Sequence, residues 1–286
     1  MFGNFIYFIL VLLIYLTYPS SEETNFTGSL SLLFCLLLSL AFAGFTRLSF
    51  NRIERRIERL GFSRSDTLFH STLLRCSILA VAVFALDVYG LSLPSFVNDL
   101  PLFARVPTLP ALLFLLLFMA HLGIVWALAF DVYRRLYRPD FGRREYVASH
   151  ASVSMPALVP WLLLSSLTDL INALPLQWPK AFLATNEGQL AYFCLVMLAI
   201  SLMGPVMIQK FWRCTPLEEG RQRDRIADIC RRAGMGYANI LYWPLFGGKI
   251  ITAGVMGLIR NFRNILVTPP LLDLLGPEEI DAVIAH

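Results

Sequence analysis

The stretch that decides the fold class runs from Val106 to Phe130 and reads VPTLPALLFLLLFMAHLGIVWALAF. It contains no Asp, Glu, Lys or Arg. An α-helix needs about 20 apolar residues to cross the hydrocarbon core of a bilayer, so this stretch is predicted to span a membrane. Four more stretches are long enough and equally free of charge: Met1 to Ser21, Thr24 to Thr46, Tyr146 to Thr168, and Gly188 to Gln209.

The composition of the whole chain points to a lipid bilayer as its solvent. Of the 286 residues, 57% are hydrophobic and 15% are charged, whereas an average soluble domain has about 25% charged residues. One globular core cannot hide this much apolar surface, and the same numbers argue against disorder and against a coiled coil. The 5 cysteines include no C-x-x-C pair, so the sequence supports neither a disulfide framework nor a cysteine zinc knuckle.

A sixth span is predicted around Leu73 to Leu93, although Asp87 interrupts it. The loop before it, from Arg47 to Arg75, carries seven arginines, and the loop from Arg134 to Arg144 carries five. The positive-inside rule places both loops in the cytoplasm, so the two loops must be separated by an even number of crossings. Together with ten basic residues from Lys210 onward, 22 of the 24 Lys and Arg lie on one side. We therefore expect a multi-pass membrane protein of six spans with both termini in the cytoplasm.

The first span is expected to stay uncleaved, because the chain starts Met-Phe-Gly-Asn and lacks the positive segment of a signal peptide. After Lys210 charges appear every few residues. The sequence thus predicts two domains, a transmembrane helical domain over residues 1–209 and a cytoplasmic domain over 210–286. The expected fold class is mainly α: a polytopic helix bundle followed by a partial α+β domain.

The cytoplasmic part is predicted to begin with a helix from about Pro216 to Ala233. Thr215 and Glu218 have the spacing of a capping box, and Gly234 follows as a stop signal. The mixed charges of this helix indicate a solvated or headgroup-facing surface, and nucleic acid is not an expected partner. No phosphate-binding glycine loop occurs.

Short extended runs follow the predicted helix. A hairpin is expected from two of these runs, Asn239 to Trp243 and Lys249 to Ala253, with its corner at Gly247-Gly248. A third strand is expected from Asn264 to Thr268, and it stops at Pro269-Pro270. Pro277-Glu278-Glu279 is a good helix start with acids in the first turn. An apolar i, i+3, i+4 face follows, formed by Ile280, Val283 and Ile284.

The run from Asn264 to His286, NILVTPPLLDLLGPEEIDAVIAH, resembles the approach to the zinc helix in integral-membrane metallopeptidases of the HtpX and CaaX-prenyl-protease type, metallopeptidase family forty-eight. In that family a strand ending in Val-Thr leads to a short Leu-Leu helix, and an acidic helix start then leads to Ala-His, the first histidine of H-E-x-x-H. Family members often carry an Asn-Ala pair in the substrate-pairing strand, and Thr252-Ala253-Gly254 stands in its place here.

The resemblance implies that His286 is a zinc ligand and that the intact protein is a zinc-dependent metalloendopeptidase acting on membrane-associated proteins. Two histidines four apart on a helix can chelate Zn²⁺, and the glutamate beside the first serves as general base. By this resemblance the general base, the second histidine and a third ligand would follow His286. The 286-residue chain itself is therefore expected to be inactive, with no catalytic residue of its own.

Several polar residues outside this run are candidates for function. His121 in the fourth span, and Asp169 with Asn172 near the outer end of the fifth, suit interhelical hydrogen bonds better than a proton path or substrate chamber. His70 and His150 are expected to be solvated. The alternative function is a non-enzymatic scaffold or transporter in which Asp87, His121 and Asp169 are functional.

Overall fold

The computed structural model of this chain describes residues 3–19, 27–98, 103, 106–175, 177–244, 251–257, 259–274 and 276–285. The chain is mainly helical and contains one small sheet. It divides into two compact units: the first comprises Met1–Ala151 and Ser165–Leu170, and the second comprises Ser152–Leu164 and Ile171–His286. This division by contacts differs from the boundary expected at residue 209, which follows a change in composition and stays a prediction.

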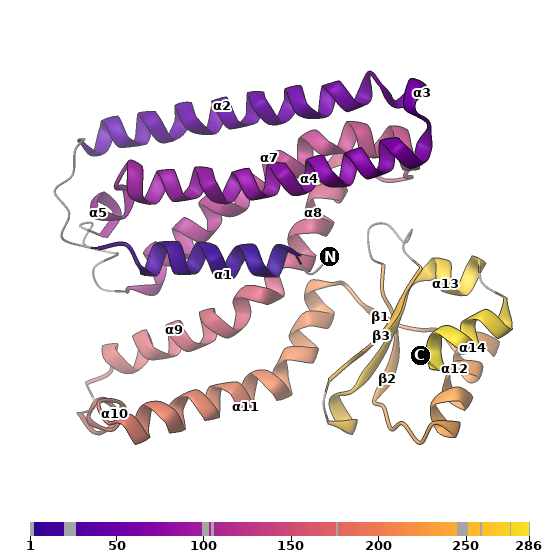
Figure 1. Ribbon diagram of the computed structural model, residues 1–286. Coiled ribbons are helices and arrows are strands. Elements are labelled where there is room, and N and C mark those ends of the chain that lie inside the picture. The colour runs from indigo at the N-terminus through magenta and orange to yellow at the C-terminus, as the bar shows by residue number, and fades with distance from the viewer. Residues whose placement is uncertain are drawn as a thin grey trace. The chain divides into compact units, whose positions relative to one another are not determined.

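The first unit is built from helices that pack along one another. Both α4 and α7 contact α1 and α2, and they also contact each other; Figure 1 shows α1, α2 and α4 running side by side. Phe118 of α7 meets Phe8 of α1 and Phe84 of α4 edge-on, with ring centroids 5.5 and 5.9 Å apart. The elements are α1 (Gly3–Leu16), α2 (Gly28–Glu54), α3 (Ile57–Leu60), α4 (Phe62–Ala85), α5 (Leu93–Asn98) and α7 (Thr108–Tyr137).

A π-helical turn, η1 (Leu86–Gly90), continues α4 at the position of Asp87. The backbone N–H of Leu91 donates to the carbonyl of Leu86 over 2.9 Å, an i to i+5 bond. Such turns carry one extra residue inside an α-helix and are frequent at functional sites. The sequence gives no signal for this turn.

The chain then forms a second set of helices: α8 (Arg143–Ser154), the 3₁₀ turn η2 (Met155–Leu158), α9 (Val159–Ala173), α10 (Gln177–Leu183) and α11 (Asn186–Phe211). The side chain of Thr185 caps α11 by accepting a hydrogen bond from Gly188 N over 3.0 Å. Gly188 is required there, because a Cβ at this position would lie 1.8 Å from the carbonyl oxygen of Phe182.

Among the described residues, four helices are long and apolar enough to cross a membrane: Gly28–Glu54, Phe62–Gly90, Thr108–Tyr137 and Asn186–Phe211. A fifth span results if Arg143–Ser154 and Val159–Ala173, bent by 65°, count as one. The apolar helix at the N-terminus is shorter, because α1 has 14 residues. The chain is therefore consistent with a membrane protein, whereas the sixth span and the orientation of the termini stay predictions.

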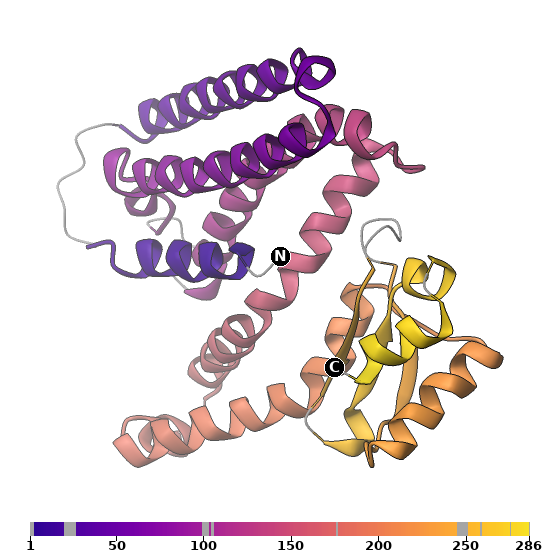
Figure 2. The same ribbon diagram turned by 45° about the vertical axis from the view of Figure 1, so that its right-hand side comes forward.

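The second unit contains a four-stranded sheet in the order β1-β2-β4-β3. Its strands are β1 (Thr215–Pro216), β2 (Asn239–Tyr242), β3 (Ala253–Met256) and β4 (Asn264–Val267). Strands β2 and β4 are parallel, with Asn239 opposite Asn264, whereas β1 and β3 are antiparallel to their neighbours. The helices α12 (Arg221–Arg232), α13 (Pro269–Leu274) and α14 (Pro277–Ala285) gather on one face of the sheet (Figures 1 and 2). The short 3₁₀ turn η4 (Arg260–Phe262) precedes β4.

One buried cluster holds this sheet and its helices together. Ile226 and Cys230 of α12 pack against Ile240 of β2 and Ile265 of β4, and all four are at most 2% exposed. Leu271 of α13 and Ile280 of α14 belong to the same cluster, together with Leu217, Val267 and Leu272. Burial of apolar surface stabilises a fold by about 25 cal/mol per Å². Because Ile280 contributes to this buried cluster, the cluster holds α14 against the sheet.

The sheet corrects two expectations from the sequence. The predicted hairpin is wrong, because the strand that follows β2 starts only at Ala253, the last residue of the predicted run, and β3 pairs with β4 and not with β2. The expected corner at Gly247-Gly248 lies outside the described residues. The predicted capping box is also wrong: Thr215 pairs with Tyr242 in β1, and α12 begins later, after Gly220. The predicted third strand and the helix from Pro277 are confirmed by β4 and α14.

Candidate functional site

A groove of about 650 Å³ lies between β3 and α14 in the second unit. One wall is formed by Ala253, Gly254 and Val255 of β3, and the other by Val283 and Ile284 of α14. Strand β3 is at the edge of the sheet and pairs only with β4 among the described strands. Val255 is 56% exposed, so the groove presents an apolar surface and the backbone of an edge strand together.

The sequence around Gly276 explains how α14 comes to line this groove. The carboxylate of Glu279 accepts a hydrogen bond from Gly276 N over 2.7 Å, which satisfies a backbone N–H just before the helix. Ile280, one residue later, is buried in the cluster under the sheet. With Ile280 turned inward, Val283 and Ile284, three and four residues on, lie along the same side of the helix.

His286, the expected zinc ligand, lies outside the described residues. Within the described parts of the chain, no group of three or more His, Cys, Asp or Glu side chains is placed to hold a metal ion. These residues therefore do not supply a zinc site by themselves. The assignments of His286 and Zn²⁺ stay predictions from the resemblance.

A second polar site lies in the helical bundle of the first unit. His121 Nε2 of α7 is 3.0 Å from Ser39 Oγ of α2 and 3.9 Å from Asp87 Oδ2 of η1. Asp87 and His121 are 0% and 1% exposed, and the ring of Phe42 packs edge-on against the imidazole. The expected interhelical hydrogen bond of His121 is thus confirmed. Its proximity to Asp87 was not predicted, since the two residues lie on different helices and no spacing rule links them.

Asp169 also has a defined structural role. Its Oδ2 accepts a hydrogen bond from Thr108 N, at the first residue of α7, over 2.9 Å. Ser165 Oγ lies 2.6 Å from Thr108 Oγ1. A carboxylate at a helix N-terminus satisfies a free N–H and interacts favourably with the helix dipole. The interhelical role expected for Asp169 is confirmed, whereas Asn172 is exposed.

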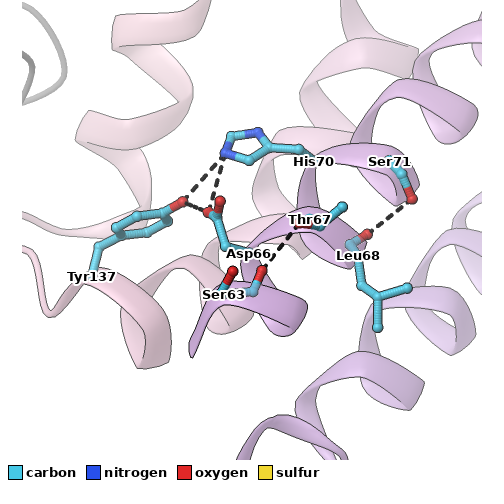
Figure 3. Close-up of polar contacts among 7 residues, drawn as sticks. All are labelled: Ser63, Asp66, Thr67, Leu68, His70, Ser71 and Tyr137. Atoms are coloured by element: carbon cyan, nitrogen blue, oxygen red, sulfur yellow. Dashed lines mark hydrogen bonds and ion pairs between the residues drawn. The ribbon is translucent and has the colours of Figure 1, made fainter. Parts of the chain in front are cut away.

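His70 belongs to a polar cluster between α4 and α7 (Figure 3). Tyr137 Oη donates to Asp66 Oδ1 and lies 3.3 Å from His70 Nε2. The same nitrogen is 3.4 Å from Asp66 Oδ1, and the His70 side chain is 60% exposed. His70 is thus solvated, as expected, but it also has polar neighbours that the sequence did not reveal.

His150 is not simply solvated, so this expectation is wrong. Its ring stacks on Trp126 with a centroid distance of 5.1 Å and an interplanar angle of 16°. Tyr146 meets the same ring edge-on at 4.6 Å. His150 is half-buried and forms part of an aromatic cluster with Trp126 and Tyr146.

Comparisons of the chain with known protein families, curated proteins and solved structures found no match. The class of the protein is therefore defined by its own features. It is a mainly helical chain in which the described residues include four or five apolar helices that could cross a membrane, and it carries a small mixed sheet.

Proposed function

We propose that this chain is the N-terminal portion of an integral-membrane zinc-dependent metalloendopeptidase that hydrolyses peptide bonds of membrane-associated proteins. The observation that supports this best is the groove between β3 and α14. Helix α14 runs to Ala285, and His286 is the next residue in the sequence. The groove is thus lined by residues of α14 that precede, by two to four positions in the sequence, the histidine that the resemblance assigns to zinc.

The groove suits an extended peptide. An edge strand offers unpaired backbone N–H and C=O groups, to which a substrate segment can add as a further strand. In this proposal the backbone of Ala253 to Met256 holds the substrate main chain. Val283 and Ile284 form an apolar wall for one of its side chains, because a strand presents alternate side chains to each face.

Zinc would supply a polarised water and a Lewis acid for the scissile carbonyl. The residues described here provide the cradle for the substrate but not a set of metal ligands. The proposal thus depends on His286 together with the residues that follow the histidine in H-E-x-x-H of the family.

The proposal places the sheet unit in the cytoplasm and adds a sixth span, formed by the N-terminal helix. The support is the distribution of basic residues, with 22 of the 24 Lys and Arg in three segments that then share one side of the membrane. Both termini are cytoplasmic in this arrangement.

The first test is to read the gene beyond codon 286, where the proposal requires Glu, any residue, any residue and His. The second test is peptide hydrolysis by the full-length protein in lipid. A chelator such as phenanthroline should abolish cleavage, and added Zn²⁺ should restore it. His286→Ala should remove both the activity and the bound zinc, whereas His70→Ala, at an exposed histidine of the first unit, should keep both. Activity that is indifferent to the chelator would rule the proposal out.

A further inference from the structure

Where α2, η1 and α7 meet, three buried polar atoms have no hydrogen-bond partner among the described residues other than the weakly donating thiol of Cys35, which lies against Asp87. They are both carboxyl oxygens of Asp87 and the Nδ1 atom of His121. The two side chains are 0% and 1% exposed, so bulk water does not supply the missing partners. Buried ionisable groups in a membrane bundle are costly, and they are retained mainly where they have a function.

The distance between Asp87 and His121 indicates whether the two side chains form an ion pair or are both neutral. A buried carboxylate and an imidazolium gain most from a direct hydrogen bond of about 2.7 to 2.9 Å, but Asp87 Oδ2 and His121 Nε2 are 3.9 Å apart. His121 Nε2 is instead hydrogen-bonded with the neutral hydroxyl of Ser39. A neutral carboxylic acid beside a neutral imidazole therefore fits this geometry better than an ion pair does.

We propose that Asp87 and His121 form a proton-binding site inside the helical bundle, in which the pair holds one exchangeable proton that resides on Asp87 at neutral pH. Loss of this proton would place a negative charge among three packed helices, and gain of a second would place a positive charge there. The site makes the bundle a candidate for a proton-coupled conformational change, and it does not depend on the peptidase proposal.

The surroundings leave few other groups to share the proton. Cys35 of α2 faces Asp87, and its thiol is a weak donor. Tyr89, two residues further along η1, is hydrogen-bonded with Thr17 Oγ1 over 2.8 Å, and Cys76 of α4 is buried. Helix α1, which packs on α4 and α7, brings only Tyr7 and Tyr15 as titratable groups, and α5 brings none. The charged residues of the three long helices all lie toward one end of each helix. The charged residue nearest to the site is Arg47 in α2, Arg75 in α4 and Asp131 in α7. All of these are eight or more residues from Ser39, Asp87 or His121 along their own helix.

The π turn places Asp87 in an irregular part of the backbone. Asp87 is the second residue of η1. π turns interrupt the regular ladder of backbone hydrogen bonds and are often found at functional sites. A charge that appears on Asp87 would act directly on this irregular turn, which connects α4 to α5.

Infrared spectroscopy of the full chain in lipid nanodiscs tests the proposal. The C=O stretching band of a protonated carboxylic acid should be present at neutral pH and disappear under alkaline conditions. Asp87→Asn should remove this band, whereas Asp169→Asn and Asp66→Asn should leave it unchanged. If Asp87→Asn does not yield folded protein, Asp87→Glu should shift the frequency of the band. A band that neither Asp87 variant alters, or no such band in the wild type, would overturn the proposal.

The role of His121 needs its own readout. In His121→Gln the second proton of the pair has no imidazole to bind, so acidification of the wild type should produce imidazolium ring bands that this variant lacks, while the carboxylic acid band is present in both. Spectra of the two proteins without such a difference would show that Asp87 titrates alone and would overturn the shared site. The measurement is repeated in two buffers of equal ionic strength, one with choline and one with Na⁺ as the cation. Loss of the band at neutral pH in the Na⁺ buffer would identify a cation site and would likewise overturn the proposed proton site.

Discussion

The indole rings of Trp212 and Trp243 stack with their centroids 4.6 Å apart and their planes at 14°. Trp212 directly follows α11, and Trp243 directly follows β2. The backbone N–H of Trp243 donates to the carbonyl of Val267 in β4 over 2.8 Å. Within the second unit, this pair therefore attaches the end of the longest helix of that unit to the parallel centre of the sheet.

Trp243→Ala should loosen the attachment between α11 and the sheet. An aromatic pair contributes about 0.5–1.5 kcal/mol beyond the area that it buries, and the variant loses this term together with the burial of the indole. Hydrogen exchange of the β4 amides should accelerate accordingly. Trp243→Phe retains a ring that can stack and should lose less protection. Equal protection in the wild type and the alanine variant would show that the stack does not stabilise the sheet.

Gly188→Ala should destabilise the start of α11. The added Cβ would lie 1.8 Å from the Phe182 carbonyl oxygen, so backbone must move, at a cost on the order of 1–3 kcal/mol. Gly204→Ala in the same helix meets only a side-chain carbon at 3.8 Å and should be neutral or slightly stabilising. Thermal unfolding of the purified protein in detergent distinguishes the two variants. A matching loss in both would contradict the close approach at Gly188.

Ile226→Ala should strongly destabilise the sheet unit. Ile226 is 0% exposed and packs beneath the sheet in the cluster of α12, and removal of such a side chain costs about 2–5 kcal/mol. Ile259→Ala, at a position that is 48% exposed, should cost far less. The measurement is chemical denaturation followed by the fluorescence of Trp243. A larger effect at Ile259 than at Ile226 would contradict the described core.

The thiol of Cys214 should react slowly with alkylating reagents. Burial raises the pKa of this thiol from its ordinary value of 9.0 to about 11. A raised pKa disfavours the thiolate, which is the reactive form, so in the native protein the alkylation rate should still be rising above pH 10. In denaturant the same cysteine should reach its plateau at a lower pH. Mass spectrometry of the labelled peptide gives both profiles, and identical profiles would mean that Cys214 is not shielded.

A reporter fused after Pro139, between α7 and α8, should be found on the cytoplasmic side of the membrane. The segment from Arg134 to Arg144 carries five arginines, and such loops stay inside. A reporter fused after Trp178 of α10 should be on the opposite side, because the bent pair of α8 and α9 lies between them. If both reporters were on the same side, this pair would not be a span and the six-span arrangement would be lost.

The long helices could be predicted because their signal is local. The charge-free stretches from Thr24, Val106 and Gly188 correspond to α2, α7 and α11. In lipid an unpaired backbone group costs several kcal/mol, so an apolar stretch of this length has almost no alternative to a helix. The helix at Pro277 was predicted for a similar reason, since proline and two acids mark a helix start on their own.

The sheet order and the buried pair could not be predicted in this way. The short strand at Asn239 could pair with either of two later strands. It pairs with β4 in parallel, and a parallel pair is joined by a long connection that has no turn motif in the sequence. Asp87 and His121 are 34 positions apart in the sequence, and their approach follows from how two helices pack. Thr215 has the features of a helix cap, yet its pairing with Tyr242 prevails.

The π turn at Leu86–Gly90 holds one residue more than ordinary α-helical winding would. Each residue of an α-helix turns the chain by about 100°, since 3.6 residues complete one turn. Deletion of one codon after Asp87, within the π turn, would restore ordinary winding with little rotation of the residues that follow, so Leu93 and Pro94, which α5 buries, would keep their orientation. The same deletion in the regular part of α4 would rotate everything downstream by that angle.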